Sequence, residues 1–113
     1  MTGEIQATFE QAGCSGTLYV QSLDDGADIG LAADELVIPA SVVKVQIALE
    51  AESWFADGRL DPAEPVTLRA TGRTSGPTGI SLFDDDTVVS WRDLVVLTLT
   101  ISDNHATDTG SGP

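Results

Sequence analysis

The chain has few positive charges. Lys44 is its only lysine, and four arginines bring the basic residues to five, against 18 aspartates and glutamates. The formal net charge of −13 argues against nucleic acid and against anionic membrane surfaces as partners, because both repel an acidic protein. An acidic, solvated surface is the simplest explanation of this charge.

Cysteine and long apolar runs are also scarce. Cys14 is the only cysteine, so no disulfide can form within the chain. No apolar run reaches the length of a membrane-spanning helix. The first residues lack the basic and apolar regions of a signal peptide, so the sequence as written predicts a cytoplasmic protein. A periplasmic or secreted location follows instead if a signal was removed.

Length and composition predict one small globular domain. A chain of 113 residues is long enough for one domain with a core and too short for two. The hydrophobic content of 42% is typical of folded rather than disordered proteins. We assign residues 1–108 to this domain and residues 109–113, Thr-Gly-Ser-Gly-Pro, to a flexible, linker-like tail.

Turn residues and hydrophobic patterns predict a mixture of helices and short strands. The segment from Ser41 to Ala56 is apolar on nearly every side and precedes Gly58, so we expect a buried helix there. The other predicted elements are a helix over 4–12, a hairpin of strands 17–23 and 28–31, a ribbon of 66–68 with 87–89, and a helix from a cap at Ser90 to about Ile101.

The single lysine stands in an apolar run, three residues after a serine. The i, i+3 spacing of Ser41 and Lys44 places hydroxyl and amine on the same helix face. Burying an ammonium there is costly without a partner or a function, and a helix start favours a developing oxyanion at Ser41. This arrangement activates a serine nucleophile, although a helix cap and a lysine extending to solvent would explain the same residues.

Ser102-Asp103-Asn104 is a second polar group that suits the same chemistry. A serine hydroxyl can carry a proton between an amine and a leaving nitrogen, and an asparagine amide offers both a donor and an acceptor. An ordinary polar loop has the same composition. Both motifs arise by chance in one short chain much less often than either does alone.

No cofactor or metal site is predicted. His105, the only histidine, is interpreted as a polar residue in a helical first turn, and no ligands stand at zinc-site spacing. Asp84-Asp85-Asp86 is interpreted as a solvated turn, because a calcium loop needs further oxygen ligands at fixed spacing.

The two motifs resemble those of the class A serine β-lactamases and the related penicillin-binding enzymes, whose signatures are S-x-x-K, S-D-N and K-T-G. Ser41-Val-Val-Lys44 and Ser102-Asp103-Asn104 match the first two signatures. The surroundings are similar over nearly the whole chain, in segments 57–61, 76–79, 90–94 and 102–108. The resemblance implies an α/β (α+β) fold of the β-lactamase/transpeptidase type, with residues 1–108 as a partial catalytic domain.

The resemblance also implies a role for each motif residue. Ser41 would be the acylated nucleophile, and Lys44 its proton acceptor or relay. Ser102 would pass the proton to the β-lactam nitrogen, Asn104 would bind substrate and steady Lys44, and Asp103 would be structural. The implied activity is that of a serine hydrolase that opens the β-lactam ring through an acyl-serine and so confers antibiotic resistance. Its small-molecule partner would be a β-lactam or a peptidoglycan-like peptide.

The chain lacks other parts of the family pattern. It has no K-T-G, no glutamate in a later loop to position the hydrolytic water, and no strands after Asn104. The resemblance therefore implies a truncated chain that is inactive alone and prone to aggregation. Strand 17–23 would have an open edge and the apolar helix one bare side, which a carboxy-terminal half could cover.

Two other functions fit the same residues. A D-alanyl-D-alanine peptidase or penicillin-binding homologue uses the same serine and lysine and differs in deacylation. A non-catalytic, β-lactamase-like binding domain would leave the serine idle and would use an exposed strand edge for its partner.

Overall fold

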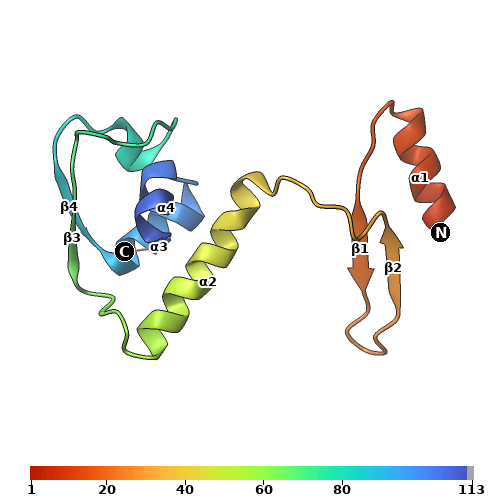
Figure 1. Ribbon diagram of the computed structural model, residues 1–113, viewed down its shortest axis with the longest axis horizontal. Helices are drawn as coiled ribbons and strands as arrows, with labels where there is room; N and C mark the ends of the chain where they lie inside the picture. Colours follow the sequence, from red (N-terminus) through yellow and green to blue (C-terminus); the bar gives the residue numbers. More distant parts are fainter. Residues whose placement is uncertain (112–113) are drawn as a thin grey trace. The chain divides into compact units, whose positions relative to one another are not determined.

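A computed structural model of the chain describes residues 1–111 (Figure 1). The chain divides into two compact units, Met1–Ile38 and Pro39–Pro113. Gly112 and Pro113, in the predicted tail, lie outside the described residues.

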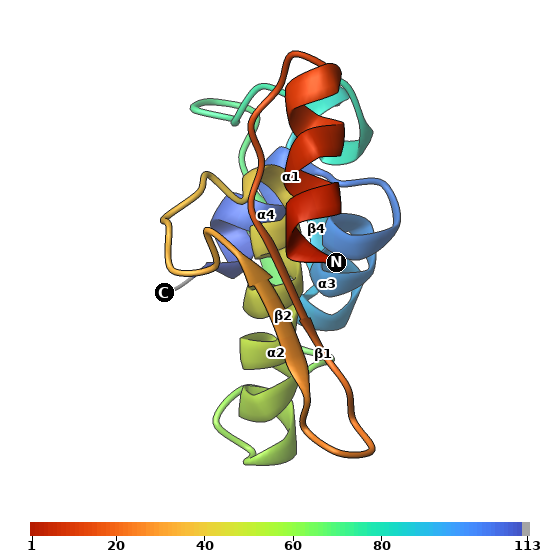
Figure 2. The ribbon, with the colours of Figure 1, turned by 90° about the vertical axis from the view of Figure 1, so that its right-hand side faces the viewer.

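The first unit consists of one helix and one hairpin. Helix α1 spans Thr2–Gln11, and strands β1 (Leu18–Gln21) and β2 (Asp28–Leu31) pair antiparallel with Leu18 opposite Leu31. Helix α1 lies alongside the hairpin and contacts β2 (Figures 1 and 2). The predicted helix and hairpin are confirmed, although the first strand is shorter at both ends than residues 17–23. Among the described residues β1 pairs only with β2, so its other edge is open.

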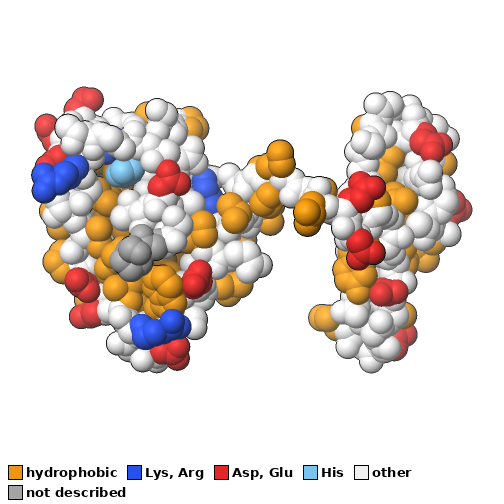
Figure 3. Space-filling model, in the orientation of Figure 1, with side chains coloured by type: hydrophobic (Ala, Val, Ile, Leu, Met, Phe, Trp, Pro, Cys, Tyr) orange, Lys and Arg blue, Asp and Glu red, His pale blue; other side chains and the backbone are white. Residues whose placement is uncertain are grey.

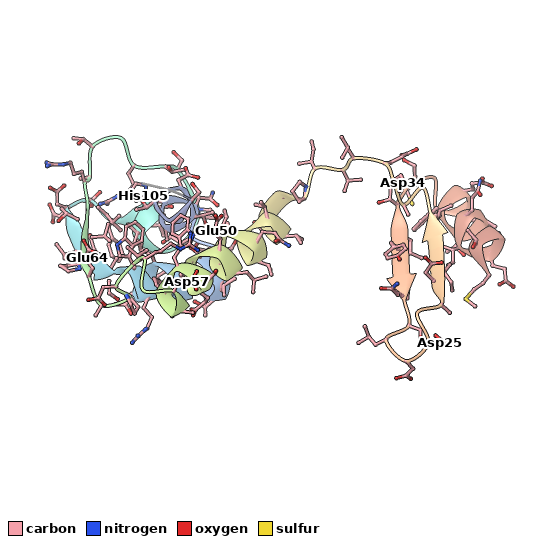
Figure 4. All side chains as sticks on the ribbon, turned by 60° about the horizontal axis from the view of Figure 1, so that its bottom comes forward. Asp25, Asp34, Glu50, Asp57, Glu64 and His105 are labelled. Atoms are coloured by element: carbon pink, nitrogen blue, oxygen red, sulfur yellow. The ribbon has the colours of Figure 1, made fainter. Side chains whose placement is uncertain are left out.

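The hairpin turn is held by its own backbone and by one carboxylate. The Ser22 N–H donates to the Ala27 carbonyl at 2.8 Å, and Gly26 adopts a left-handed φ of 73°, which glycine tolerates without strain. Asp25 lies at the tip of the hairpin (Figure 4), and its Oδ1 accepts from the Ala27 N–H at 3.1 Å. Hydrogen bonds from the Ser22 side chain and the Ala27 backbone lower the pKa of Asp25 from its usual value.

Packing in the first unit is shallow, because none of its residues is buried. Gly16 packs against the Phe9 ring, because a Cβ on residue 16 would lie 2.9 Å from the ring. The first unit has no buried interior. Local hydrogen bonds and contacts between partly exposed side chains therefore stabilise it.

The second unit contains the remaining elements and a small core. Helix α2 spans Val43–Ala56 and follows a 3₁₀ turn at Ala40–Val42. Strands β3 (Pro65–Leu68) and β4 (Thr87–Ser90) pair antiparallel, and helices α3 (Trp91–Thr100) and α4 (Asn104–Gly110) follow. A second 3₁₀ turn, Gly79–Leu82, lies between the strands in sequence and contacts α4. The buried apolar cluster contains Leu68, Ile80, Leu94 and Ala106.

Helix α2 is buried on one side only. Its buried residues are Lys44, Ala48 and Ala51, whereas Val45 is 49% exposed and Leu49 is 60% exposed. The prediction of a helix buried on every side is wrong for the described residues, and the expected bare side is present. Apolar side chains reach the surface in several places (Figure 3).

The predicted cap of α3 is confirmed, and α4 extends beyond the predicted domain end. Ser90 Oγ accepts from the Asp93 N–H at 3.1 Å and donates to the Asp93 carboxylate at 2.8 Å. The Asp93 carboxylate thus binds the hydroxyl of the capping residue, Ser90. Helix α4 includes Thr109 and Gly110, so these two residues are helical rather than part of a tail. None of the helices among residues 1–111 has the length and apolarity to cross a membrane.

Candidate active site

Ser41 lies in the short 3₁₀ turn that leads into α2. The preceding residue, Ala40, has a φ of +47°, a left-handed conformation that costs free energy in a residue with a Cβ. The Val42 N–H closes the turn by donating to the Pro39 carbonyl at 3.0 Å. Ser41 itself is exposed, so its hydroxyl is accessible to a ligand. The predicted helix start at residue 41 is corrected to a 3₁₀ turn over Ala40–Val42, with α2 beginning at Val43.

The Lys44 side chain is 6% exposed and its amine is surrounded by oxygen atoms. Nζ donates to both the carbonyl and the Oγ of Ser102 at 2.7 Å, and to Asn104 Oδ1 at 2.9 Å. Its distance to Ser41 Oγ is longer, 3.5 Å. These contacts compensate for the loss of water around the buried amine. The expected proximity of the amine to Ser41 and Asn104 is confirmed.

Ser102 connects the amine to the Ser41 hydroxyl. Ser102 Oγ donates to Ser41 Oγ at 3.0 Å while it accepts from Lys44 Nζ. Its φ of +57° is left-handed, a conformation found most often at functional sites and tight turns. Two hydrogen bonds, of 3.0 and 2.7 Å, therefore join Ser41 to the amine through Ser102, in addition to the direct contact of 3.5 Å.

Asp103 is fully buried and holds the residues on either side of it in place. Its Oδ1 accepts from the N–H groups of His105 and Ala106 at 2.9 and 3.1 Å, and caps α4. Its Oδ2 accepts from the Ile80 N–H, which ties α4 to the 3₁₀ turn. A Cβ on residue 79 would lie 2.2 Å from Oδ2, so only glycine fits at Gly79. The geometry agrees with a structural role for Asp103.

Both ends of the Asn104 amide are bound. Oδ1 accepts from Lys44, and Nδ2 donates to the Ser75 carbonyl at 3.1 Å. The second N–H of an asparagine amide is a further donor. Asn104 is half-buried and shares an open pocket with Ser41 and Lys44; Thr74, Thr107 and Asp108 also line it.

His105 is hydrogen-bonded to Thr74, which lines the pocket. Its Nδ1 accepts from the Thr74 N–H at 3.1 Å, and it lies on α4 in the second unit (Figure 4). This contact agrees with its interpretation as a polar helix residue. No cluster of three or more potential metal ligands lies within the described part of the chain.

Residues 1–109 match the model of the beta-lactamase enzyme family. The chain belongs to that family. A curated relative, the beta-lactamase regulatory protein BlaB of Streptomyces cacaoi, is 33% identical over 107 residues. The match covers 93% of this chain and 34% of BlaB, so the chain spans about a third of that relative.

Solved structures of PBP-A share the fold. A PBP-A variant in an acyl-enzyme complex with penicillin G matches with a TM-score of 0.82 and 24% identity, over 96% of this chain and 42% of PBP-A. A second PBP-A structure matches with a TM-score of 0.75, also at 24% identity, over 95% of this chain and 42% of PBP-A. The predicted β-lactamase/transpeptidase fold is confirmed, and the chain contains part of it.

The beta-lactamase-family motifs converge in space, and other residues join them. Ser41, Lys44, Ser102 and Asn104 form one hydrogen-bonded group. Thr107 and Asp108 follow Asn104 by three and four residues on α4, a spacing that could have indicated a shared face. Thr74 and Ser75 carry no such signal, because they come from a loop whose path the sequence does not reveal. Gly79 begins the second 3₁₀ turn and belongs to segment 76–79, which resembles the family.

Proposed function

We propose that this chain carries the acylation machinery of a serine β-lactamase or penicillin-binding enzyme. The observation that supports the proposal is the hydrogen-bonded group of Ser41, Ser102 and Lys44 beside an open pocket. An exposed hydroxyl within reach of an amine and a second hydroxyl is the arrangement that generates a serine nucleophile.

In the proposed reaction Ser41 Oγ attacks the carbonyl carbon of a β-lactam. An Oγ–C bond forms and the ring C–N bond breaks, which leaves an acyl-serine. The Ser41 proton passes to the Lys44 amine in its neutral form. Ser102 delivers its own proton to the ring nitrogen and takes a proton back from Lys44, whose Nζ lies 2.7 Å from Ser102 Oγ, so that both side chains regain their starting forms. Proton transfer and acylation are thus balanced within three side chains.

The neighbouring residues hold this group in place. Asn104 fixes the amine of Lys44 and offers its free amide N–H to the ligand. Asp103 caps α4 and thereby positions Ser102 and Asn104. The Ser41 N–H, at the start of the helical segment, is a candidate donor to the developing oxyanion.

Release of the acyl group distinguishes the members of this class. Hydrolysis would make the protein a β-lactamase, and slow release would make it a D-alanyl-D-alanine peptidase or penicillin-binding homologue. The described residues support the acylation step, which both activities share.

A second candidate is a non-catalytic domain that binds a ligand or partner and leaves Ser41 idle. The observation in its favour is that the 33% identical relative is named a regulatory protein. The apolar side of α2 and the open edge of β1 would be available to a partner protein.

Covalent labelling distinguishes the two candidates. The chain is incubated with a fluorescent penicillin, with and without a carboxy-terminal portion of PBP-A supplied as a separate polypeptide, and the adduct is located by mass spectrometry. We expect an adduct on Ser41 that is lost in Ser41→Ala and slowed about 10²-fold or more in Lys44→Ala. Thr100→Ala, on α3 and outside the pocket, is the matched control. Absence of an adduct under both conditions would favour the binding domain.

A further inference from the structure

Thr78 lies outside the pocket lining and binds the backbone directly before Ser102. Its Oγ1 donates to the Ile101 carbonyl at 2.9 Å. We infer that Thr78 is a positioning residue for acylation, because this hydrogen bond holds the peptide group before Ser102 in the orientation that brings the Ser102 hydroxyl to Ser41 and Lys44. The inference rests on the proposed function, since it names a residue that would serve the same reaction.

The backbone of Ser102 needs support from its neighbours. Its φ of +57° lies in the left-handed region, which costs free energy in a residue with a Cβ. Such a conformation persists only where surrounding contacts fix it. The carbonyl and the hydroxyl of Ser102 both accept from the Lys44 amine, so the catalytic contacts depend on this same conformation.

The Ile101 carbonyl is the group through which Thr78 can act on Ser102. Ile101 is the C-cap of α3, where the last carbonyls of a helix have no partner within the helix. Its carbonyl shares one peptide plane with the Ser102 N–H, and the next rotatable bond along the chain defines φ of Ser102. A hydrogen bond to that carbonyl therefore restrains the plane from which the left-handed turn begins.

The loop that carries Thr78 is itself fixed, so its hydroxyl has a defined position. A Cβ on residue 76 would lie 2.8 Å from Ser81 Oγ, and a Cβ on residue 79 would lie 2.2 Å from Asp103 Oδ2. Both glycines therefore approach their neighbours as closely as a backbone can. Thr78 stands between them with an extended backbone, at φ −141° and ψ 157°. Contacts on both sides of Thr78 thus keep its side chain at the end of α3.

The experiment measures the second-order rate of Ser41 acylation by the fluorescent penicillin, under the condition that gives an adduct. Thr78→Val keeps the shape of the side chain and removes the hydroxyl, whereas Thr78→Ser keeps the hydroxyl. We expect Thr78→Val to be roughly tenfold slower, between the loss of one neutral hydrogen bond and the misplacement of a catalytic group. Thr78→Ser should restore most of the rate.

Thr87→Val is the matched control. Thr87 is half-buried like Thr78, and its Oγ1 donates to the Asp85 carbonyl at 3.2 Å, away from the pocket. The substitution makes the same chemical change and removes the same kind of hydrogen bond. Its acylation rate should equal that of the unchanged chain.

A double-mutant cycle with Ser102→Ala separates positioning from a general disturbance of the pocket. Ser102→Ala leaves no hydroxyl to position, so Thr78→Val should cause little further loss of rate in that background. Two outcomes would overturn the inference and leave the proposed function intact. One is a rate of Thr78→Val equal to that of the unchanged chain, and the other is an equal loss in both backgrounds.

A second cycle uses denaturant unfolding and does not depend on acylation. Glycine adopts a left-handed φ without strain, so Thr78→Val should lower the unfolding midpoint less in Ser102→Gly than in the unchanged chain. Equal decreases in the two backgrounds would show that Thr78 does not support the conformation of Ser102, and would overturn the inference. If penicillin does not acylate Ser41 at all, the proposed function fails, and this cycle still decides whether Thr78 holds Ser102.

Discussion

The two units of the chain are built in different ways. The first has a helix and a hairpin with no buried residue, whereas the second surrounds a cluster of buried apolar side chains and a buried carboxylate. The candidate active site belongs wholly to the second unit, where α2 and the start of α4 meet through Lys44. Placing a buried amine within hydrogen-bond distance of several oxygens requires elements that bury side chains between them, and no residue of the first unit is buried.

The largest expected effect is on the first unit taken alone. A peptide of residues 1–38 should be largely unfolded, because a two-stranded hairpin and a ten-residue helix are each marginal in water without a core. Circular dichroism should show no cooperative thermal transition. A sharp melt of the peptide would show that the contrast between the units is wrong.

A smaller but still large effect is expected from Gly79→Ala in the second unit. The added Cβ would collide with Asp103 Oδ2 and the φ of +60° would be strained, so we expect a loss of about 3 kcal/mol in the free energy of unfolding. Denaturant unfolding measures this change. Gly72→Ala is the matched control, because it also has a positive φ but nothing within 4 Å, and should cost about 1 kcal/mol. Equal effects of the two substitutions would contradict the proposed support of Asp103.

The bare side of α2 should promote association of the chain. Leu49 is 60% exposed, and Leu49→Gln should weaken self-association roughly five- to tenfold while leaving the helix content unchanged. Light scattering over a concentration series measures this change, with Glu52→Gln on the same helix as control. A chain that stays monomeric at high concentration before any substitution would refute the expected aggregation.

The smallest expected effect is a pH dependence of the hairpin turn. Hydrogen bonds lower the pKa of Asp25 in the folded turn, so its ionised form stabilises the turn above the usual pKa of 3.8. This contribution is lost as the pH falls below that value and through the lower pKa of the folded state. The chemical shift of the Ala27 amide should change as Asp25 is protonated. This pH-dependent change should disappear in Asp25→Asn and persist in Asp24→Asn. A shift that stays constant between pH 5 and about 2 would exclude the contribution.

Local features of the fold could be predicted because their causes are local. The hairpin follows from Asp24-Asp25-Gly26 between two β-prone runs, and the start of α3 follows from Ser90 and Asp93. The burial of α2 was overestimated, because an apolar pattern does not specify whether other elements cover every side. The length of α4 was underestimated, because Gly110 was interpreted as part of a tail although it continues the helix.

The candidate site was predictable only in part. The spacing of Ser41 and Lys44 and the run from Ser102 to Asn104 identified the chemical groups, because each motif lies within a few residues of sequence. Roles in catalysis for these residues remain predictions. Thr74 and Asp108 were not foreseen, since they belong to the pocket only through contacts between distant segments.

The sequence by itself determined which side chains are available, the local turns and caps, and a single amine three residues from a serine. Only the tertiary structure decided that this amine contacts Ser102 and Asn104, which lie 58 and 60 residues further along the chain. It also decided that Ser102 bridges the two groups and that Asp108 faces the same pocket. The physical reason is that hydrogen bonds between distant residues depend on how helices pack, and packing reflects the whole set of contacts rather than any one motif.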